Sequence, residues 1–251
     1  MAALDRFPIS TRPASPAPRR RSAFTSGLVL TTPPGSQPRV LDDLRRAILA
    51  GDEPPGTLIP IDPVARFFGV SHIPVREALK ALTSEGLVEH VPHVGYSVAK
   101  LTFAEFEELY EVRRALENAA LRVAVQRATD IDDEKLRHSH RALETADSSG
   151  DDRAYHAESR RFHRAMIAPS GMQRLLNMHA TAWNMTESAR PMARVAERDR
   201  RHFCTEHDRL LDAFVARDTE RLLAESTQHF MHLRKALVEF RDDPEVFRQA
   251  D

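Results

Sequence analysis

The chain has little of several things on which common protein classes depend. Its 251 residues include one cysteine, one tryptophan and nine glycines, and only 6% of them are aromatic. A single Cys204 excludes an intramolecular disulfide and any cysteine-based zinc ribbon. The low glycine and aromatic content, beside abundant Ala, Leu, Arg and Glu, favours helix over sheet.

Long apolar runs are absent as well. No window of the sequence approaches the ~18 apolar residues that a membrane-spanning helix needs, and the N-terminus has no apolar signal core. We therefore expect a cytoplasmic protein that has no membrane partner.

An excess of one charge sign is also missing, since 36 Lys and Arg face 37 Asp and Glu. Residues 1–36 are the exception: five arginines oppose one aspartate there, and six of the sixteen prolines gather there. Such a stretch buries too little apolar surface to offset its ordering entropy, so it predicts a disordered tail. Neither residues 37–100 nor residues 101–251 are basic overall, so charge alone does not indicate a DNA-binding protein.

The next stretch begins with short elements. Residues 37–51 place apolar side chains at helical spacing, which predicts a helix. Leu58 and Ile59 form an apolar pair long enough only for an edge strand. Asp62 as N-cap, with Pro63 at the first helical position, predicts a second short helix.

The segment GVSHIPVREAL predicts a third helix, with Ser71 as N-cap. Pro74 falls in the first turn, where a missing N–H costs nothing. Apolar residues at helical spacing form its buried face: Val75, Ala78, Leu79 and Leu82. Polar residues form the opposite face: His72, Arg76, Lys80 and Thr83. The sequence LVEHVPHVGYSVA then predicts two strands joined by a turn at 92–95.

Two short helices joined by a tight turn and followed by a hairpin make a winged helix-turn-helix. In this motif the second helix enters the DNA major groove, and the hairpin lies along the backbone. The guanidinium of Arg76 matches the O6 and N7 atoms of guanine. The alternative for Arg76 and Lys80 is a solvated helix face.

Residues 38–100 resemble the DNA-binding domain of the GntR family of bacterial transcription regulators, through VREAL, LTSEGLV and the glycine of the wing. The resemblance implies contacts with a double-stranded DNA operator from these residues: Ser71, His72, Ile73, Arg76, Lys80, His93 and Gly95. Two positions depart from the family pattern. His72 replaces an arginine, and Asp62 stands where some members carry another, so we expect modest affinity for an unusual operator.

Residues 101–251 contain only helical patterns. Thr102 and Glu105 form a capping box for a helix through about residue 126. Its predicted apolar side consists of Phe106, Leu109, Leu116 and Ala120. Five further helical patterns follow, near 132–148, 152–168, 171–189, 196–217 and 218–241. Short breaks separate them, which favours an antiparallel bundle.

The predicted fold class is therefore mostly α: an N-terminal winged helix-turn-helix with a small β-hairpin wing, plus a C-terminal all-α antiparallel helical bundle. We expect four parts: a Pro- and Arg-rich tail (1–36), a DNA-binding domain (37–100), an effector-binding and dimerisation domain (101–243) and a C-terminal tail (244–251).

Nine of the twelve histidines lie in the predicted bundle, and His163, His207 and His232 fall on three separate helices. Imidazoles that face one bundle core can ligate a divalent ion, whereas scattered surface histidines are the alternative. The segments RRFHRAM, TEHDRLLDAFVARD and HFMHLRKAL resemble the effector domain of the FadR-type branch, called FCD. The resemblance implies a metal held by these three histidines and by an aspartate four residues before the first.

Ser159 occupies that aspartate position in this chain. A serine hydroxyl is a poor metal ligand, so we expect zinc or nickel to bind more weakly than in members with aspartate. Arg113 and Glu117, four residues apart, have the spacing of a surface salt bridge. The resemblance implies instead that Arg113 faces an effector cavity and binds a small carboxylate; Arg190 is a second candidate.

The leading prediction is a homodimeric transcription regulator, in the simplest case a repressor, whose operator binding is modulated by a small organic acid. One alternative is a metal-dependent hydrolytic enzyme using the three histidines, although no HExxH, GxSxG or phosphate-loop motif is present. Another is a regulator that no longer senses an effector, in keeping with the missing aspartate. We predict a protein that is not an enzyme.

Overall fold

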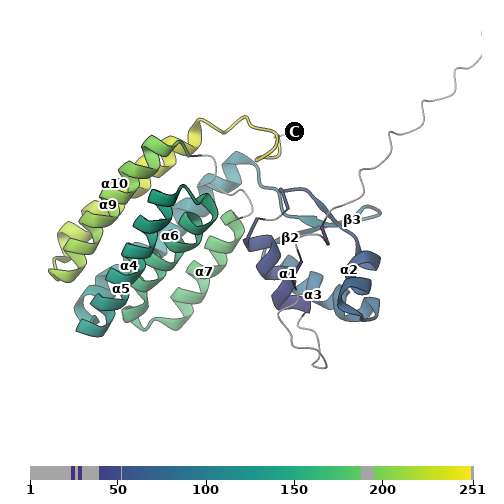
Figure 1. Cartoon of the computed structure of the whole chain (residues 1–251), viewed down its shortest axis with the longest axis horizontal. Helices are drawn as coiled ribbons and strands as arrows, with labels where there is room; N and C mark the ends of the chain where they lie inside the picture. The colour runs from purple at the N-terminus through teal and green to yellow at the C-terminus, as the bar shows by residue number, and fades with distance from the viewer. Residues whose placement is uncertain (1–23, 26–27, 30–39, 52, 188–194, 250–251) are drawn as a thin grey trace, which may run out of the picture.

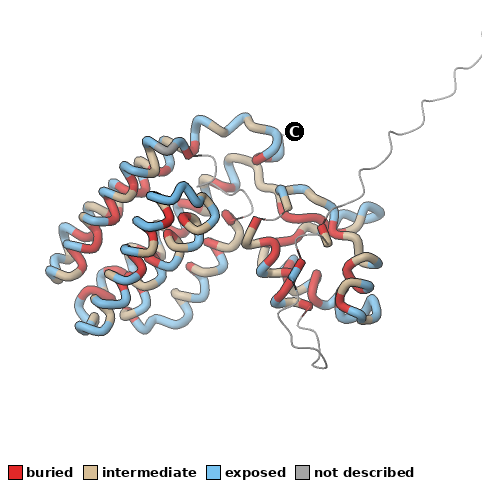
Figure 2. The backbone as a smooth tube through the Cα atoms, in the orientation of Figure 1, coloured by how far each residue is buried: buried red, intermediate tan, exposed pale blue. Residues whose placement is uncertain are grey.

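The computed structural model describes residues 24–25, 28–29, 40–51, 53–187 and 195–249. Figure 1 shows two groups of elements, a small sheet with three helices on one side and a stack of long helices on the other. Buried positions run along the inward side of each helix (Figure 2), as expected for amphipathic helices around a core.

The first group contains three helices and three strands, in this order: α1 (Val40–Leu49), β1 (Leu58–Ile59), α2 (Ile61–Phe68), α3 (His72–Ser84), β2 (Val88–Val91) and β3 (Gly95–Val98). The strand order is β1-β3-β2, and both pairings are antiparallel. Leu58 is paired with Ser97, and Val91 with Gly95, so β1 is the predicted edge strand and β2–β3 the predicted wing.

The turn between α2 and α3 has the predicted glycine and serine. Gly69 caps the end of α2 in the left-handed conformation, φ 66°. Ser71 has the extended backbone of an N-cap, although its side chain makes no capping hydrogen bond. The start of α2 differs from the prediction: Pro60 is its N-cap, so Asp62 lies inside the first turn, where the helix dipole favours a carboxylate.

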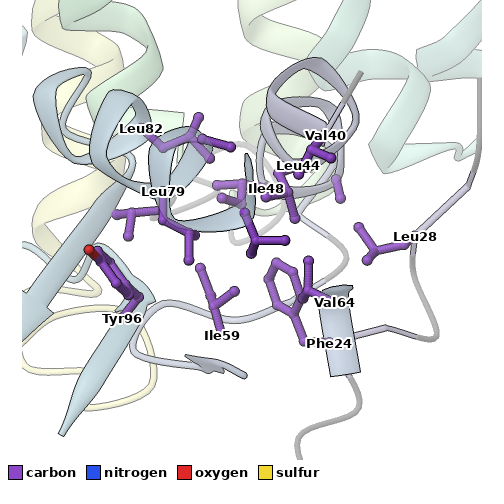
Figure 3. Packing of buried hydrophobic residues seen from close by; sticks show 14 of the residues in the cluster. Phe24, Leu28, Val40, Leu44, Ile48, Ile59, Val64, Leu79, Leu82 and Tyr96 are labelled. Atoms are coloured by element: carbon purple, nitrogen blue, oxygen red, sulfur yellow. The ribbon is translucent and has the colours of Figure 1, made fainter. Parts of the chain in front are cut away.

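The core of the winged helix-turn-helix gathers side chains from every element (Figure 3), among them Leu44 of α1, Val64 of α2 and Leu79 of α3. Phe24 and Leu28 belong to the predicted tail, yet both are buried in this core. Their apolar side chains, four residues apart, gain from leaving water in a way that composition averaged over 36 residues conceals. Most other residues of the predicted tail lie outside the described ranges.

The second group contains the six predicted helices: α4 (Phe103–Arg127), α5 (Asp130–Ser149), α6 (Asp152–Ile167), α7 (Gln173–Glu187), α9 (Glu197–Val215) and α10 (Thr219–Val238). A short 3-10 helix, Ala168–Ser170, links α6 to α7. The capping box at Thr102 is confirmed, since the amide of Glu105 donates to its hydroxyl and its own amide donates to the Glu105 carboxylate. Described residues 101–249 contain no strand.

The buried side of α4 matches the apolar stripe predicted from the sequence only in part: Phe106 and Ala120 are buried as expected. Leu109 and Leu116 are only partly buried, whereas Arg113 and Glu117 are fully inside. A long helix in a bundle buries whichever face meets its neighbours, and here that face includes two charged residues. Their burial requires hydrogen-bond or ion-pair partners inside the bundle.

The end of the chain covers the start of α4. Val246 and Phe247 are buried, and the Phe247 ring lies 5.3 Å from the Phe103 ring and 5.2 Å from the Phe106 ring. The amide of Arg248 donates to the carbonyl of Leu101 at 2.8 Å. The segment expected to be a C-terminal tail is thus part of the bundle core up to residue 247.

Within the described part of the chain, none of the helices combines the length and the apolar character that crossing a membrane requires.

Leu79 of α3 has no exposed surface, so Leu79→Ala removes methyl groups from a closed core. We expect the free energy of unfolding to fall by about 2–5 kcal/mol, measured by urea denaturation. Ile73 on the same helix is 71% exposed, so Ile73→Ala is the matched control and leaves stability nearly unchanged. Equal losses in the two variants would contradict the packing of α3.

Candidate functional site

The N-terminal half of α3 presents the predicted DNA-contacting residues to solvent. Ser71, His72, Ile73 and Arg76 are all exposed. Arg76 makes no hydrogen bond or ion pair with any residue that the structure describes, whereas Lys80 pairs with Glu77 at 2.9 Å. The buried stripe on the opposite side of α3 is the predicted one. The solvent-exposed face of α3 is therefore polar and carries the Arg76 guanidinium.

The two departures from the family pattern contact each other. His72 Nε2 lies 3.1 Å from Asp62 Oδ1, across the turn that joins α2 and α3. Both side chains are more than half exposed, so the contact adds little stability. It does hold the imidazole toward α2, which leaves Arg76 as the cation of this face that has no partner in the described structure.

The tip of the wing is exposed and tightly turned. His93 has φ 65°, and Gly95, at the start of β3, has φ 115°, a conformation that favours glycine. Val94 between them is exposed. The predicted wing contacts, His93 and Gly95, thus lie at the outer end of the hairpin.

Inside the bundle, three histidines from three helices converge. They are His163 of α6, His207 of α9 and His229 of α10, all buried, with one nitrogen from each within 4.8 Å of the others. His163 Nε2 lies 3.4 Å from His207 Nε2. Two predicted ligands are brought together, but the third position is filled by His229 and not by His232.

The helix geometry explains the difference. Three residues along an α-helix turn about 300°, so His229 and His232 lie on neighbouring faces of α10. His229 belongs to the buried stripe of that helix, which also includes Leu222, Ser226, Leu233 and Leu237. His232 lies nearer the surface and contacts Glu206. The periodicity of apolar residues in α10 was the signal that could have selected His229.

Glu117 holds His163 in place. Its Oε1 lies 2.9 Å from His163 Nδ1, and its Oε2 lies 3.2 Å from His179 Nε2 of α7. Burial by itself would raise the pKa of Glu117, but the attraction of His163 and the hydrogen bonds from His163 and His179 lower it well below the usual range. A carboxylate that accepts the Nδ1–H of His163 leaves its Nε2 lone pair directed to the cluster.

The other two histidines can also direct a ring nitrogen to the cluster. His229 Nδ1 lies 2.8 Å from Glu206 Oε2, so its Nε2 is likewise free. Burial, with nearby His229 and His163, holds the pKa of His207 well below 6.5. His207 Nδ1 is buried and has no hydrogen-bond partner among the described residues.

This donor set fits a divalent metal. Neutral imidazoles are good ligands for zinc and nickel, and two nitrogens bound to one tetrahedral zinc lie about 3.4 Å apart. Ser159, one turn before His163, is buried and lines the same cavity, so it occupies the place expected of the missing aspartate.

Arg113 lines this cavity too, and it is not part of a surface salt bridge. Its guanidinium carbon lies 3.6 Å from the Trp183 ring centre and 4.6 Å from that of Tyr110. One nitrogen donates to the Thr186 hydroxyl at 3.2 Å, and the buried Nε has no hydrogen-bond partner in the described structure. An unmatched buried donor beside three histidines is a natural partner for an acceptor from outside the chain.

The cavity is small as the structure stands, about 20 Å³, which is room for roughly one water. Next to it, Glu187 at the end of α7 accepts from Trp183 Nε1 at 3.0 Å and lies 2.7 Å from His156 Nε2. Burial opposes ionisation of Glu187, but His156, Arg160 and Arg113 outweigh it and lower its pKa. Arg190, the second predicted effector residue, lies outside the described residues.

Sequence reasoning missed His179 and Glu187, and it considered Glu206 only as a candidate base and not as the partner of a histidine. No apolar pattern marks a buried acid or histidine, and these residues become visible only when α7, α9 and α10 are placed around α4 and α6.

The architecture defines the class: a winged helix-turn-helix joined to an all-helical bundle is the organisation of a DNA-binding regulator with a second domain. The family models agree. The model for bacterial regulatory proteins of the gntR family matches residues 37–98, and the FCD domain model matches residues 108–232.

Proteins of similar sequence are also described as transcription regulators. An HTH-type regulator of Agrobacterium vitis, from the ttuE-ttuC' intergenic region, is 34% identical over 128 residues, 50% of this chain and 75% of that one. YdhC of Bacillus subtilis, also an HTH-type transcriptional regulator, is 25% identical over 76% of this chain and 86% of its own length. A probable D-xylose utilization operon repressor of Paenarthrobacter nicotinovorans is 33% identical over 58% of this chain and 62% of its own.

Solved structures agree on the fold. That of Escherichia coli McbR/YncC superposes with a TM-score of 0.73 at 24% identity and covers 80% of this chain and 96% of that one. This chain belongs to the GntR family of transcription regulators and carries an FCD domain.

The lowered pKa of Glu117 gives a pH-dependent prediction. A depressed folded pKa contributes stability above the unfolded value of about 4.3, and that stability is lost as the pH falls through the folded pKa. We expect Glu117→Gln, with chelator present, to be about 1–3 kcal/mol less stable at pH 7. The difference should keep its size down to about pH 5 and shrink in more acidic solution.

Urea unfolding at a series of pH values measures this difference. Glu108→Gln, at an exposed position of α4, is the control and should match the parent throughout. A Glu117→Gln variant as stable as the parent at pH 7 would show that the carboxylate does not hold the two histidines.

Proposed function

We propose that this chain is a homodimeric repressor whose affinity for operator DNA changes when a small organic acid enters the cavity beside Arg113. The observation that carries the effector part is the buried Arg113 Nε with no partner in the described structure. DNA recognition rests on the exposed face of α3 and on the wing. A protein with this task acts at the chromosome, so we place it in the cytoplasm, and the names of its relatives favour regulation over catalysis.

Two copies of the chain would read a pseudo-palindromic operator, because one winged helix contacts only a few base pairs. Arg76 would bind guanine in the major groove. Lys80 would release Glu77 to meet a phosphate, and the wing tip would follow the backbone. His72 is held by Asp62 and would contribute less than the arginine that the family carries at that position.

The effector would be a small carboxylate. The Arg113 guanidinium can donate two parallel hydrogen bonds to a carboxylate, and its Nε is one of the two donors required. Because the cavity holds about one water, Trp183 or Tyr110 must move to admit an organic acid. Ligand binding would therefore be coupled to a side-chain rearrangement in α4 or α7.

We propose that a metal, when bound, is held by His163, His207 and His229, with Ser159 beside them. It would supply positive charge and open positions for ligand oxygens next to Arg113. The chain's own part is to orient the imidazoles. Glu117 does so for His163, and Glu206 does so for His229.

Helix α7 would carry the signal to the DNA-binding domain. Trp183 and Thr186 contact Arg113, whereas Met185 packs against Gly86, two residues after the end of α3. The packing is close: a Cβ at Gly86 would come within 2.7 Å of Met185 Cγ. In Figure 1, α7 lies on the side of the bundle nearest α1.

A second path runs through a cleft of about 530 Å³ between α1 and the bundle. His156 and Glu187 line both this cleft and the cavity beside Arg113. On the other wall, Arg45 of α1 forms two hydrogen bonds, 2.6 and 2.8 Å long, with Glu85 at the end of α3. A ligand that moves Glu187 would therefore act close to the base of the recognition helix, as coupling between two sites requires.

For DNA binding, we expect Arg76→Ala to lower operator affinity by about 1–3 kcal/mol and to relax sequence preference. Lys80→Ala should weaken all sequences alike and reduce the slope of log K against log salt by about 1. Gel shifts with the protein's own upstream DNA measure both. Full specificity in Arg76→Ala would overturn the assignment of α3 as the recognition helix.

For the effector, a panel of small carboxylates, each with and without zinc or nickel, should contain at least one that weakens operator binding by the parent protein. Arg113→Gln should lose that response while still binding DNA, and Arg113→Lys should keep part of it, since lysine has the charge but not the planar fork. Arg122→Gln, at an exposed position of α4, is the control. Operator affinity unchanged across the panel would favour a regulator that has lost effector sensing.

A further inference from the structure

A second cluster of metal-ligand residues lies beside the buried one, toward the surface of α9 and α10. His202 and Glu206 are one turn apart on α9, and His232 faces them from α10. His202 Nε2 lies 3.2 Å from Glu206 Oε1 and 3.3 Å from His232 Nδ1. His232 Nδ1 also contacts Glu206 Oε1 directly. Three donor atoms therefore meet at one point.

Their separations suit a shared metal ion. Two donors bound at about 2.1 Å to one tetrahedral ion are about 3.4 Å apart, close to the two longer distances here. The two imidazole nitrogens lie 3.3 Å apart, close to the 3.2 Å between His202 Nε2 and Glu206 Oε1. An ion among the three atoms would satisfy all of them at once.

The exposure and charge of these three side chains also suit a metal site. His202 is 52% exposed and His232 36%, while Glu206 is only 2% exposed. An ion can therefore arrive from solvent and meet a buried carboxylate behind two more exposed rings. Arg209 lies 3.8 Å from Glu206, but its Nε is directed to Glu225 at 3.2 Å.

We propose that His202, Glu206 and His232 form a second divalent-metal site, separate from the three buried histidines. Two nitrogens and one carboxylate oxygen favour zinc or nickel over magnesium or calcium and leave at least one position for water. The site accounts for His232, which the buried cluster does not use.

The two sites share one carboxylate. Glu206 Oε1 belongs to the surface site, while Oε2 accepts the hydrogen bond from His229 Nδ1. A carboxylate that orients a metal-binding histidine affects its basicity, so an ion on Oε1 acts on the ligand set of the buried site. The surface site can be filled whether or not the buried one is.

The test is metal stoichiometry of the full chain, stripped with chelator and then equilibrated with Co²⁺, Ni²⁺ or Zn²⁺. We expect the double variant His202→Ala/His232→Ala to bind one ion per chain fewer than the parent. His163→Ala, which damages only the buried site, should keep the ion that the double variant loses. His138→Ala, at an exposed position of α5, is the control and should bind as many ions as the parent.

His202 is exposed and His232 is partly exposed, so the circular dichroism and urea midpoint of the double variant should stay close to those of the parent. If this folded variant binds as many ions as the parent, the second site does not exist. If only His163→Ala loses an ion, the surface proposal fails while the buried site stands. If only the double variant loses one, the surface site is supported and the buried metal is not.

Discussion

The Glu117 carboxylate is fully buried and accepts hydrogen bonds from two histidines on two other helices. An isolated buried charge would cost far more than the fold can supply, so α4, α6 and α7 must meet in the one arrangement that brings both imidazoles to it. The same contact fixes which nitrogen of His163 faces the interior. A stability requirement thus becomes a functional one, since the free Nε2 is what a metal needs.

Glu206 repeats the arrangement on the other side of the cluster, where it holds His229 of α10. Arg113 completes the interior, stacked against Trp183 and joined to Thr186, so α7 carries two of its partners. Because Met185 of α7 packs against Gly86, the charged interior and the recognition helix are two contacts apart. A bundle organised around buried charges is therefore well suited to report a charged ligand to a distant DNA contact.

The winged helix-turn-helix could be predicted almost completely, because caps, glycines and apolar periodicity are local signals; only the start of α2 and the burial of Phe24 and Leu28 were missed. The six bundle helices were also predictable. The interior of the bundle was not: Leu109 and Leu116 were expected inside, where Arg113 and Glu117 lie instead. A periodicity that counts only apolar residues cannot find a core stabilised by ion pairs. The prediction of His232 came from the family resemblance, whereas the apolar periodicity of α10 favours His229.

We conclude that Glu117 fixes the proton of His163 on Nδ1, while burial lowers the pKa of this imidazole and so favours its neutral form. Long-range ¹H–¹⁵N NMR of the histidine side chains, with His163→Gln for assignment, observes this directly. We predict the Nδ1–H tautomer for His163 in the metal-free protein, with a hydrogen-bonded proton whose resonance shifts in Glu117→Gln. A His163 that carries its proton on Nε2, or that titrates as an exposed histidine does, would contradict it.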